Sequence, residues 1–544
     1  MKSSYYTKFI YFFIAVCFTL TLHAQDGFSD CLDAYKNGDY KKTIECLNDY
    51  IYKNPKDVDA LFFRSKCYGI LGDYKSAFTD INNAIANYNK NAKAQKEDLY
   101  TQRGQYYVDI ENYNQALKDY ETAHKINSKY TDVLFDRANL YYTLKNYSAS
   151  DNDWKDILKI EKDNMNAQIG LARNMIARGQ TDDAIKELDR LERIEPTNPF
   201  IFAYRSDAYA KKEDYRSAID DLIDWCDYDD IDSAKADILA EYSGHELTYA
   251  LAKVSEKVVK AKDDNEKYKW LLLRNSLYTI HGMYKKAIED YNAIETLTSN
   301  PNERFYFVRG NCYANLGEYD KAIADYNEGL KLGDDKNLYN SKASVKRLKG
   351  DYKSAITNFS KVIELDPMNS NAYFNRGWTK ELDKNYQGAL KDYTTSIKID
   401  NKVTYPYFFR GRLYLLQLND FLSAKKDFQM ALSLDTVIRI DGNCCQFALF
   451  YLGRSKEAIA LQDSILEKYP TSNNYFDATC LYSLLDRQSD AIKYLKLAFE
   501  KGYRSFYLMQ DNIGLDNIRN TEEYKDLVEE WKNKAAMDIE SSFE

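Results

Sequence analysis

Proline and glycine are scarce in this sequence, which has only 7 prolines and 21 glycines among its 544 residues. Sheets with tight turns depend on residues of this kind, so a strand-rich fold is a poor match for the chain. Hydrophobic residues make up 44% of the chain, and many recur at helical spacing. One compact core seldom serves a chain of this length, which leaves several domains or an array of repeats. The composition predicts an all-α protein.

An excess of basic residues is also missing. Lys and Arg together number 75 against 84 Asp and Glu, for a net charge of −9. No segment concentrates enough positive charge to hold the phosphates of a nucleic acid. Nucleic acid is therefore not an expected partner.

Long apolar runs are absent after the first residues of the chain. Lys2 and Lys8 form a short positive region, and the segment 9–22 that follows carries no charge. This pattern is typical of a secretory signal peptide, and the run is shorter than the roughly 20 residues of a membrane-spanning helix. We expect residues 1–24 to be a signal peptide and the protein to be exported, to the periplasm, the outer membrane or the outside. An uncleaved membrane anchor and a lipoprotein acylated at Cys17 are the open alternatives.

Signatures of catalysis and of metal binding are missing too. The histidines after the signal peptide, His124, His245 and His281, lie far apart, with no Cys or carboxylate at metal-ligand spacing. No phosphate-binding glycine loop, nucleophile elbow or zincin motif occurs. The acidic stretch 220–232 lacks the glycine and the closing glutamate of an EF-hand, so we expect a solvated acidic face there. We predict no catalytic residue, no cofactor and no metal site; an enzyme would need a site assembled from distant helices.

The cysteines show no disulfide framework in their spacing. Most of them fall on predicted helix-packing positions, where a small apolar residue suffices. Buried free thiols are the favoured interpretation, and one bridged pair of unspecified members is the alternative. The eight that follow the signal peptide are Cys31, Cys46, Cys67, Cys226, Cys312, Cys444, Cys445 and Cys480.

What the sequence does contain is an internal period. A small residue follows each Gly-Asp-Tyr-like turn, and successive members of this series are 33 to 39 residues apart. Such a period is the signature of a repeat architecture. The series is Thr43, Ala77, Ala116, Ser150, Ala184, Ala218, Ala252, Ala287, Ala322, Ala355, Ala389, Ala424, Ala458 and Ala491.

Each period predicts two amphipathic helices joined by a tight turn. Large and small residues recur with the 3.6-residue helical period in 306–313, before one turn, and in 319–330, after it. In the turn, Gly adopts a conformation that is costly for other residues, and Asp caps the next helix. Small residues at the crossings let the helices approach, while Tyr fills the space between units. Turns of this kind occupy 38–40, 72–74, 317–319 and 350–352.

Proline placement and one long period agree with this scheme. In a helix interior a proline would cost on the order of 3 kcal/mol. Every proline falls between two predicted helices or at a helix start. The period of 39 residues predicts an extended loop near 87–94. The prolines are Pro55, Pro196, Pro199, Pro301, Pro367, Pro406 and Pro470.

These features resemble the tetratricopeptide-repeat family over residues 25–504. The resemblance implies a right-handed α-solenoid of about fourteen helical hairpins, in which each unit buries its faces against its neighbours. Ala252 lies in the most divergent unit, which lacks the Tyr turn. The expected organisation is a signal peptide in 1–24, an N-terminal array in 25–232, a degenerate repeat in 233–267, a C-terminal array in 268–505, and capping helices with a tail in 506–544.

Arg and Asp also recur sixteen residues apart, and seventeen apart in one repeat. In a hairpin folded at its Gly these positions lie at similar heights on antiparallel helices. We predict partly buried ion pairs that fix register more than they add stability, because desolvation offsets much of the attraction. Binding of acidic ligands by these arginines is the alternative. The pairs are Arg64/Asp80, Arg103/Asp119, Arg137/Asp153, Arg205/Asp221, Arg274/Asp290, Arg309/Asp325, Arg376/Asp392 and Arg410/Asp427.

A phenylalanine lies two residues before five of these arginines. By resemblance to the family, that helical face lines a concave groove where peptides or partner helices bind, and aromatic rings there would supply contact area. A place in the core is the equal alternative. The candidate partner-binding residues are Phe62, Phe135, Phe307, Phe374 and Phe408.

Two functions compete on this basis. The first is a non-catalytic scaffold of the cell envelope that binds other proteins or peptides on the concave surface. The second is a receptor that binds glycans or peptides in an aromatic groove. The sequence names neither the partner nor the oligomeric state.

Overall fold

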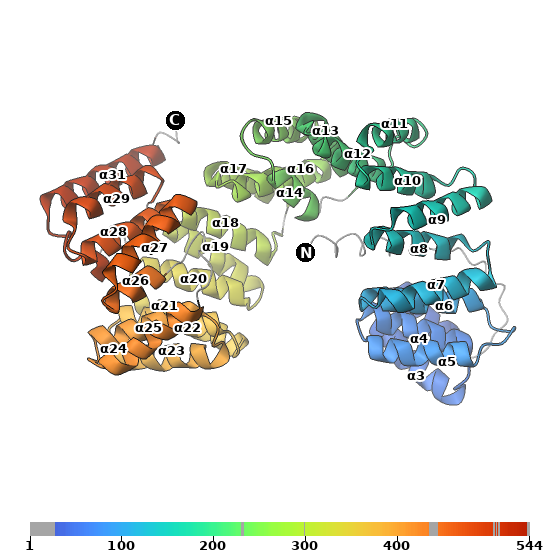
Figure 1. The fold of residues 1–544 in the computed structure, drawn as a ribbon, viewed down its shortest axis with the longest axis horizontal. Coiled ribbons are helices and arrows are strands. Elements are labelled where there is room, and N and C mark those ends of the chain that lie inside the picture. The colour runs from blue at the N-terminus through green and yellow to red at the C-terminus, as the bar shows by residue number, and fades with distance from the viewer. Residues whose placement is uncertain are drawn as a thin grey trace. The chain divides into compact units, whose positions relative to one another are not determined.

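The computed structural model describes residues 28–229, 233–298, 300–434, 444–503, 506, 509 and 512–540. These residues form helices throughout, without strands, and the chain divides into two compact units, Met1–Lys260 and Ala261–Glu544 (Figure 1). The expected signal peptide lies outside the described residues. None of the helices within them is both long and apolar enough to cross a membrane.

The first unit contains seven successive helix pairs. In each pair we call the first helix A and the second B. The pairs are α2 (Phe28–Lys36) with α3 (Tyr40–Lys53), α4 (Val58–Ile70) with α5 (Tyr74–Ala86), α6 (Lys96–Asp109) with α7 (Tyr113–Ile126), α8 (Thr131–Thr143) with α9 (Tyr147–Ile160), α10 (Met165–Ala177) with α11 (Thr181–Glu192), α12 (Pro199–Lys211) with α13 (Tyr215–Tyr228), and α14 (Ser233–Ala240) with α15 (Gly244–Lys260).

The second unit contains seven more pairs, so the predicted number of about fourteen hairpins is confirmed for the described residues. The pairs are α16 (Asp264–Ile280) with α17 (Tyr284–Leu297), α18 (Glu303–Asn315) with α19 (Tyr319–Leu332), α20 (Lys336–Leu348) with α21 (Tyr352–Leu365), α22 (Ser370–Leu382) with α23 (Tyr386–Ile399), α24 (Thr404–Leu416) with α25 (Phe421–Leu434), α26 (Cys445–Tyr451) with α27 (Ser455–Lys468), and α28 (Ser472–Leu484) with α29 (Gln488–Glu500).

The turn between helices A and B is built as the sequence predicts. Gly350 has a φ of 78°, and the Asp351 carboxylate accepts a hydrogen bond from the backbone N–H of Ser354. The left-handed position holds Gly in seven of the described turns and another residue in six. Those six are Glu111, Lys145, Glu213, Lys384, Asn419 and Asp486. Residues other than Gly pay an energetic cost in this conformation. These six residues adopt it nonetheless, so the hairpin geometry is kept where Gly is absent.

The small residues of the sequence period lie in the helix crossings, with one exception. Thirteen of the fourteen are fully or almost fully buried on their B helices. Ala252 is exposed, and Ala250 is the buried small residue of α15. The prediction for Ala252 is wrong because α15 begins at Gly244 without a Gly-Asp-Tyr turn and runs for 17 residues, which shifts its buried face.

Helix crossings in several hairpins depend on a glycine in helix A. A Cβ added at Gly104 would lie 2.5 Å from Cε1 of Tyr120, and one at Gly310 would lie 2.6 Å from the same atom of Tyr326. Both tyrosines are buried on helix B. The aromatic ring occupies the space next to the glycine, where a side chain would otherwise lie. The glycine in helix A and the tyrosine in helix B therefore depend on each other.

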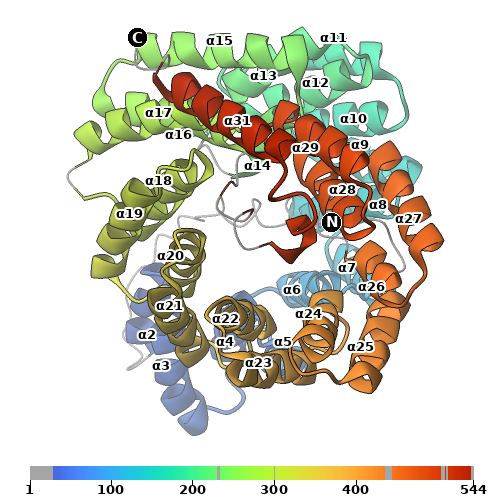
Figure 2. The same ribbon diagram turned by 90° about the vertical axis from the view of Figure 1, so that its left-hand side faces the viewer.

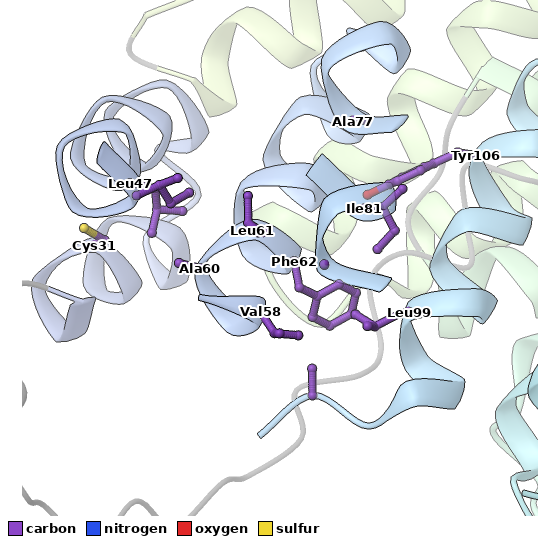
Figure 3. Packing of buried hydrophobic residues seen from close by; sticks show 13 residues of the cluster. Cys31, Leu47, Val58, Ala60, Leu61, Phe62, Ala77, Ile81, Leu99 and Tyr106 are labelled. Atoms are coloured by element: carbon purple, nitrogen blue, oxygen red, sulfur yellow. The ribbon is translucent and has the colours of Figure 1, made fainter. Parts of the chain in front are cut away.

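The core of the first hairpins is continuous from α2 to α6. Figure 3 shows its buried side chains, with the Phe62 ring close to Leu99. A disulfide joins Cys31 in α2 to Cys46 in α3. The favoured prediction of free thiols is therefore wrong for these two residues, and the alternative of one bridged pair holds. The other six cysteines of the described ranges are buried.

Segments after the last hairpin cover its end. The 3₁₀ helix η2 (Ile513–Leu515) contacts α28, and α31 (Glu522–Glu540) contacts α29. Leu515 and Ile518 are fully buried in the cluster formed with these helices. The stacking face of the last hairpin is thereby shielded from water, as a repeat array requires.

Loops and prolines follow the predicted plan. Residues 87–95 connect α5 to α6, and the Asp59 carboxylate holds this loop by accepting hydrogen bonds from the backbone of Lys93 and Ala94. Pro199 and Pro406 lie in the first turn of a helix, and the other prolines lie between helices. The expected loop near 87–94 is confirmed.

Candidate functional site

All eight predicted Arg/Asp pairs form. In each pair the guanidinium donates through Nε and Nη2 to both oxygens of the partner carboxylate, at distances of 2.6 to 2.9 Å. Every one of these aspartates is buried. Each pair joins helix A to helix B of one hairpin, so the bidentate geometry fixes their relative height. The arginines are thus engaged inside the fold, which removes the alternative that they bind acidic ligands.

The remaining nitrogen of several of these arginines reaches the hairpin before it. Nη1 of Arg64 donates to Asn48 of α3 (2.8 Å), and Nη1 of Arg103 donates to Asn82 of α5 (2.7 Å). The same bond goes to a side chain of the preceding B helix from Arg205, Arg309, Arg376 and Arg410. One side chain therefore connects three helices, and the spacing between hairpins is set along with the register within each.

Six hairpins lack this pair, and each fills the position differently. Cys46 stands 34 residues before Asp80, so the disulfide takes the place of the ion pair in the first hairpin. In α10–α11 the matching residues are Leu171 and Glu187, and an open hollow of about 520 Å³ is lined by both of them. In α26–α27 they are the buried Cys445 and the half-buried Leu461.

The acidic stretch is not the solvated face that we predicted. Asp221 pairs with Arg205, Asp220 pairs with Lys253, and Asp227 pairs with Lys257. Lysines of α15 thus neutralise carboxylates of α13. Asp230 and Asp232 lie outside the described residues. Within the described ranges, no three His, Cys, Asp or Glu side chains are placed to hold a metal ion.

The five candidate phenylalanines divide into two groups. Phe62 and Phe408 expose only 6% and 5% of their surface, so these two rings belong to the core. Phe135, Phe307 and Phe374 are half-buried. The core alternative holds for the first group, because their rings pack between adjacent hairpins, and partner binding stays a prediction for the second.

Phe374 belongs to a group of side chains that comes from three consecutive A helices. In Figure 2, α20, α22 and α24 lie on one face of the second unit and α21, α23 and α25 lie on the opposite face. The Phe374 ring centroid is 5.1 Å from that of Phe409, and the Trp378 centroid is 5.5 Å from Phe409. We call the group the α20–α24 cluster; it consists of Arg347, Phe374, Asn375, Trp378, Glu381, Phe409 and Arg412.

Two arginines lie over these rings. The Arg347 guanidinium carbon is 4.0 Å from the centroid of Trp378, and that of Arg412 is 4.5 Å from the centroid of Phe409. At such distances the ring quadrupole attracts the cation. The arrangement orders both guanidinium groups on a partly exposed aromatic surface.

Arg412 has a carboxylate partner within the α20–α24 cluster. Its Nη2 donates to Glu381 (2.7 Å), and the hydroxyl of Tyr393 donates to the other oxygen of Glu381 (2.6 Å). Burial alone lowers the pKa of Arg412, but the Glu381 carboxylate raises it above its usual value. The Glu381 carboxylate therefore compensates the positive charge of Arg412.

Sequence reasoning identified only Phe374 in the α20–α24 cluster. Trp378 and Arg412 each lie two residues after an arginine of the Arg/Asp series, Arg376 and Arg410. Arg347 lies five residues after Lys342, which stands where the other repeats have that arginine. The missed signal is thus a pair of repeat positions in the second half of helix A, two and five residues after the arginine position, which carry a cation or an aromatic residue here.

Comparisons with known families find the repeat at three places. Models described as tetratricopeptide repeat or TPR repeat match residues 97–130, 304–334 and 343–379. The third match contains Arg347, Asn375 and Trp378. The matched stretches fall in both units.

Curated relatives share parts of the chain. DnaJ homolog subfamily C member 3 from Gallus gallus is 22% identical over 191 residues, which are 33% of this chain and 30% of that protein. Tetratricopeptide repeat protein 12 from Homo sapiens is 44% identical over 62 residues, which are 11% of this chain and 9% of that protein. The chain thus spans less than half of the length of these relatives.

Similar solved structures include yeast Tom70 and a tetratricopeptide repeat protein from Parabacteroides merdae. Tom70 has a TM-score of 0.39 and 15% identity, over 80% of this chain and 99% of that one. The Parabacteroides protein has a TM-score of 0.30 and 18% identity, over 58% of this chain and 96% of that one. The three family matches, in hairpins whose geometry recurs along both units, show that the chain is a tetratricopeptide-repeat protein.

Proposed function

We propose that the protein is a non-catalytic scaffold that binds segments of other polypeptides on the A-helix face of its second unit. Proteins with tetratricopeptide repeats bind other proteins. The observation that carries the proposal is the α20–α24 cluster, where half-buried aromatic rings and ordered guanidinium groups share one surface. Rigid aromatic side chains supply binding area at a small entropic cost.

The interior of the hairpins supports the same proposal. In the eight Arg/Asp pairs the charges of the arginine and the aspartate compensate each other between helix A and helix B, and the aspartates are buried. Side chains at the ends of the A helices remain for contacts with a partner. Because the fold is held by repeated internal bonds, this surface is organised before a partner arrives, which lowers the cost of binding.

We also propose that the protein works outside the cytoplasm, in the periplasm or at the cell surface. The basic and apolar pattern of residues 1–24 supports export, and a disulfide between Cys31 and Cys46 suits an oxidising compartment. Mass spectrometry of the protein from fractionated native cells provides the test. We expect an N-terminus near Gln25 in the envelope or secreted fraction; an intact Met1 in the cytoplasmic fraction would contradict export.

Selection from a random-peptide display library tests the binding function. We expect the chain to retain peptides, and we expect Trp378→Ala combined with Phe409→Ala to weaken their binding at least about tenfold, since two aromatic contacts are lost. Phe421→Ala with Leu422→Ala is the matched control. It removes two side chains, each 67% exposed, from the B helix α25.

Two outcomes would contradict the proposed function. One is that no peptide is retained by the unaltered chain. The other is that the α25 control weakens binding as much as the change at Trp378 and Phe409, which would place the contact elsewhere. Circular dichroism of each variant verifies that its helices are intact.

A further inference from the structure

Two large apolar side chains project from the start of α25, on the B-helix face of the second unit. Phe421 and Leu422 each expose 67% of their surface. Leu416, at the end of α24 just before this turn, exposes 42%. Single exposed apolar side chains are ordinary on a protein surface, but a group of them marks a place of interaction. The start of α25 is therefore a candidate for contact with another surface.

The same repeat position is filled differently in the other hairpins. Most B helices begin with a tyrosine, and the second residue of every other B helix is polar. Leu422 alone places a large apolar side chain there. The exposure of this side chain is thus a feature of one hairpin and not a consequence of the repeat.

Lysines follow the two apolar residues on the same face of α25. Lys425 and Lys426 lie one helical turn further along and are exposed. We call Phe421, Leu422, Lys425 and Lys426 the α25 patch. The one acidic residue of α25, Asp427, is buried in its pair with the arginine of α24. The outer face of this helix therefore combines positive charge with apolar side chains and carries no carboxylate.

The preceding B helix continues the basic surface. On α23, Lys391 and Lys398 are exposed, while the one acidic residue of that helix, Asp392, is buried in its ion pairs. Asp420 lies in the turn before α25 and caps the helix by accepting a hydrogen bond from the backbone N–H of Ser423. The chain as a whole has a net charge of −9. An anionic surface would therefore attract the chain at this place more than elsewhere.

We infer that the α25 patch binds the surface of a membrane that contains anionic lipids. Phe421 and Leu422 would enter the boundary between headgroups and acyl chains, and the two lysines would contact the headgroups. Phe and Leu beside Lys are typical of helices that lie in a membrane interface. A protein partner is a poorer match, because lysine is depleted from protein interfaces and leucine is uncommon among their hot spots.

This inference goes beyond the proposed function and does not depend on it. The α25 patch lies on the face of the second unit opposite the α20–α24 cluster (Figure 2). Membrane contact through α25 would thus leave the A-helix face open to a polypeptide partner. A patch of this size gives reversible binding that rises with lipid concentration, since stable anchoring needs a second signal.

Sedimentation with lipid vesicles tests the inference. The protein is taken as native cells process it, and its variants are compared with the unaltered chain. We expect binding to vesicles of phosphatidylglycerol and phosphatidylcholine, and binding at least about tenfold weaker to phosphatidylcholine alone, because the attraction of the lysines is lost. Phe421→Ala with Leu422→Ala should weaken binding to the anionic vesicles at least about tenfold, since two apolar side chains no longer enter the interface.

A change of charge tests the contribution of the lysines. Lys425→Gln with Lys426→Gln should weaken binding to the anionic vesicles at least about tenfold at low ionic strength. The difference from the unaltered chain should shrink at high salt, because screening reduces the attraction of the unaltered patch too. The charge-matched control is Lys493→Gln with Lys496→Gln, which removes two exposed lysines from the B helix α29. This control should bind as the unaltered chain does.

A fluorescent label locates the contact on the chain. Leu422→Cys carries a nitrobenzoxadiazole label, and Ser489→Cys carries the same label at the equivalent repeat position of α29. We expect anionic vesicles to shift the emission of the label at 422 to shorter wavelength, and lipids with spin-labelled acyl chains to quench it. The label at 489 should show neither change. This readout is independent of any contribution of residues 1–24 to vesicle binding.

The outcomes separate this inference from the proposed function. Absence of binding to anionic vesicles, or binding that survives both changes in the α25 patch, would overturn the inference. So would a dimer in sedimentation velocity that Phe421→Ala with Leu422→Ala dissociates, because a second copy would then cover the patch. None of these results touches peptide binding, which is measured without lipid. Trp378→Ala with Phe409→Ala should weaken peptide binding and leave vesicle binding unchanged.

Discussion

Changing Arg137 to Leu should destabilise the first unit by about 3–5 kcal/mol, which is the usual cost of removing one partner from a buried ion pair. Arg137 donates to both oxygens of Asp153, at 2.9 and 2.6 Å, and Asp153 is buried. The loss arises mainly from the carboxylate that is left behind without a cation. Urea-induced unfolding of the full chain, followed by circular dichroism and by hydrogen exchange of α8 and α9, measures it.

Two controls separate the buried pair from charge in general. The double change Arg137→Leu with Asp153→Leu should recover most of the loss, because apolar groups can replace a buried pair at little cost. Other hairpins already use Leu there: Leu171 matches the arginine position and Leu461 matches the aspartate position. Lys159→Ala, in an exposed pair on the same α9, should cost less than about 1 kcal/mol.

The loss in Arg137→Leu should depend on pH. Burial already raises the pKa of Asp153, and the Arg137 guanidinium opposes that rise. Without the arginine the folded-state pKa rises further above the unfolded value. The folded state is then favoured below the unfolded pKa of about 4, and this contribution disappears as the pH rises through the folded pKa. The deficit relative to the unaltered chain should be smaller at pH 4.5 than at pH 7.5, and a deficit that grows on acidification would contradict the assignment.

Gly310→Ala should destabilise the second unit by about 2 kcal/mol, although helix propensity alone would favour Ala by roughly 0.5–1 kcal/mol. A Cβ at this position would lie 2.6 Å from Cε1 of Tyr326. The ring cannot move away easily, because it is fully buried and its hydroxyl donates to Asn311 (2.7 Å). The sign of the change in unfolding free energy therefore decides between packing and propensity.

A second substitution tests the same crossing from its other side. Tyr326→Leu combined with Gly310→Ala copies the buried Ala172 and Leu188 of α10–α11. We expect the double variant to be more stable than the sum of the two single losses predicts, by more than about 1 kcal/mol. Additive losses would show that the glycine and the ring do not share one space.

The fold was readable from the sequence because its determinants repeat. The period of small residues, the turn chemistry and the Arg/Asp spacing all derive from contacts within one hairpin or between adjacent hairpins, and a local rule holds at every repeat. The prediction failed at Ala252, where α15 has neither the turn nor the usual length. The buried small residue of this helix therefore does not lie where the sequence period predicts it. It also failed for the acidic stretch, since the lysines that neutralise it lie about thirty residues further along the chain.

The site was less predictable than the fold. Phe62 and Phe374 occupy the same repeat position, yet one ring is buried and the other is half-buried, because exposure depends on the neighbouring hairpin. Arg347 drew no notice, since a lone arginine at the end of a helix gives no sign in the sequence that the Trp378 ring of the next hairpin lies against it.

Site-specific photocrosslinking in native cells tests most directly whether the A-helix face of the second unit holds the partner. A photoreactive phenylalanine analogue would replace either Trp378 on α22 or the exposed Lys391 on α23. We expect discrete protein adducts from position 378 and none from position 391. Adducts from position 391 with none from position 378 would contradict the account.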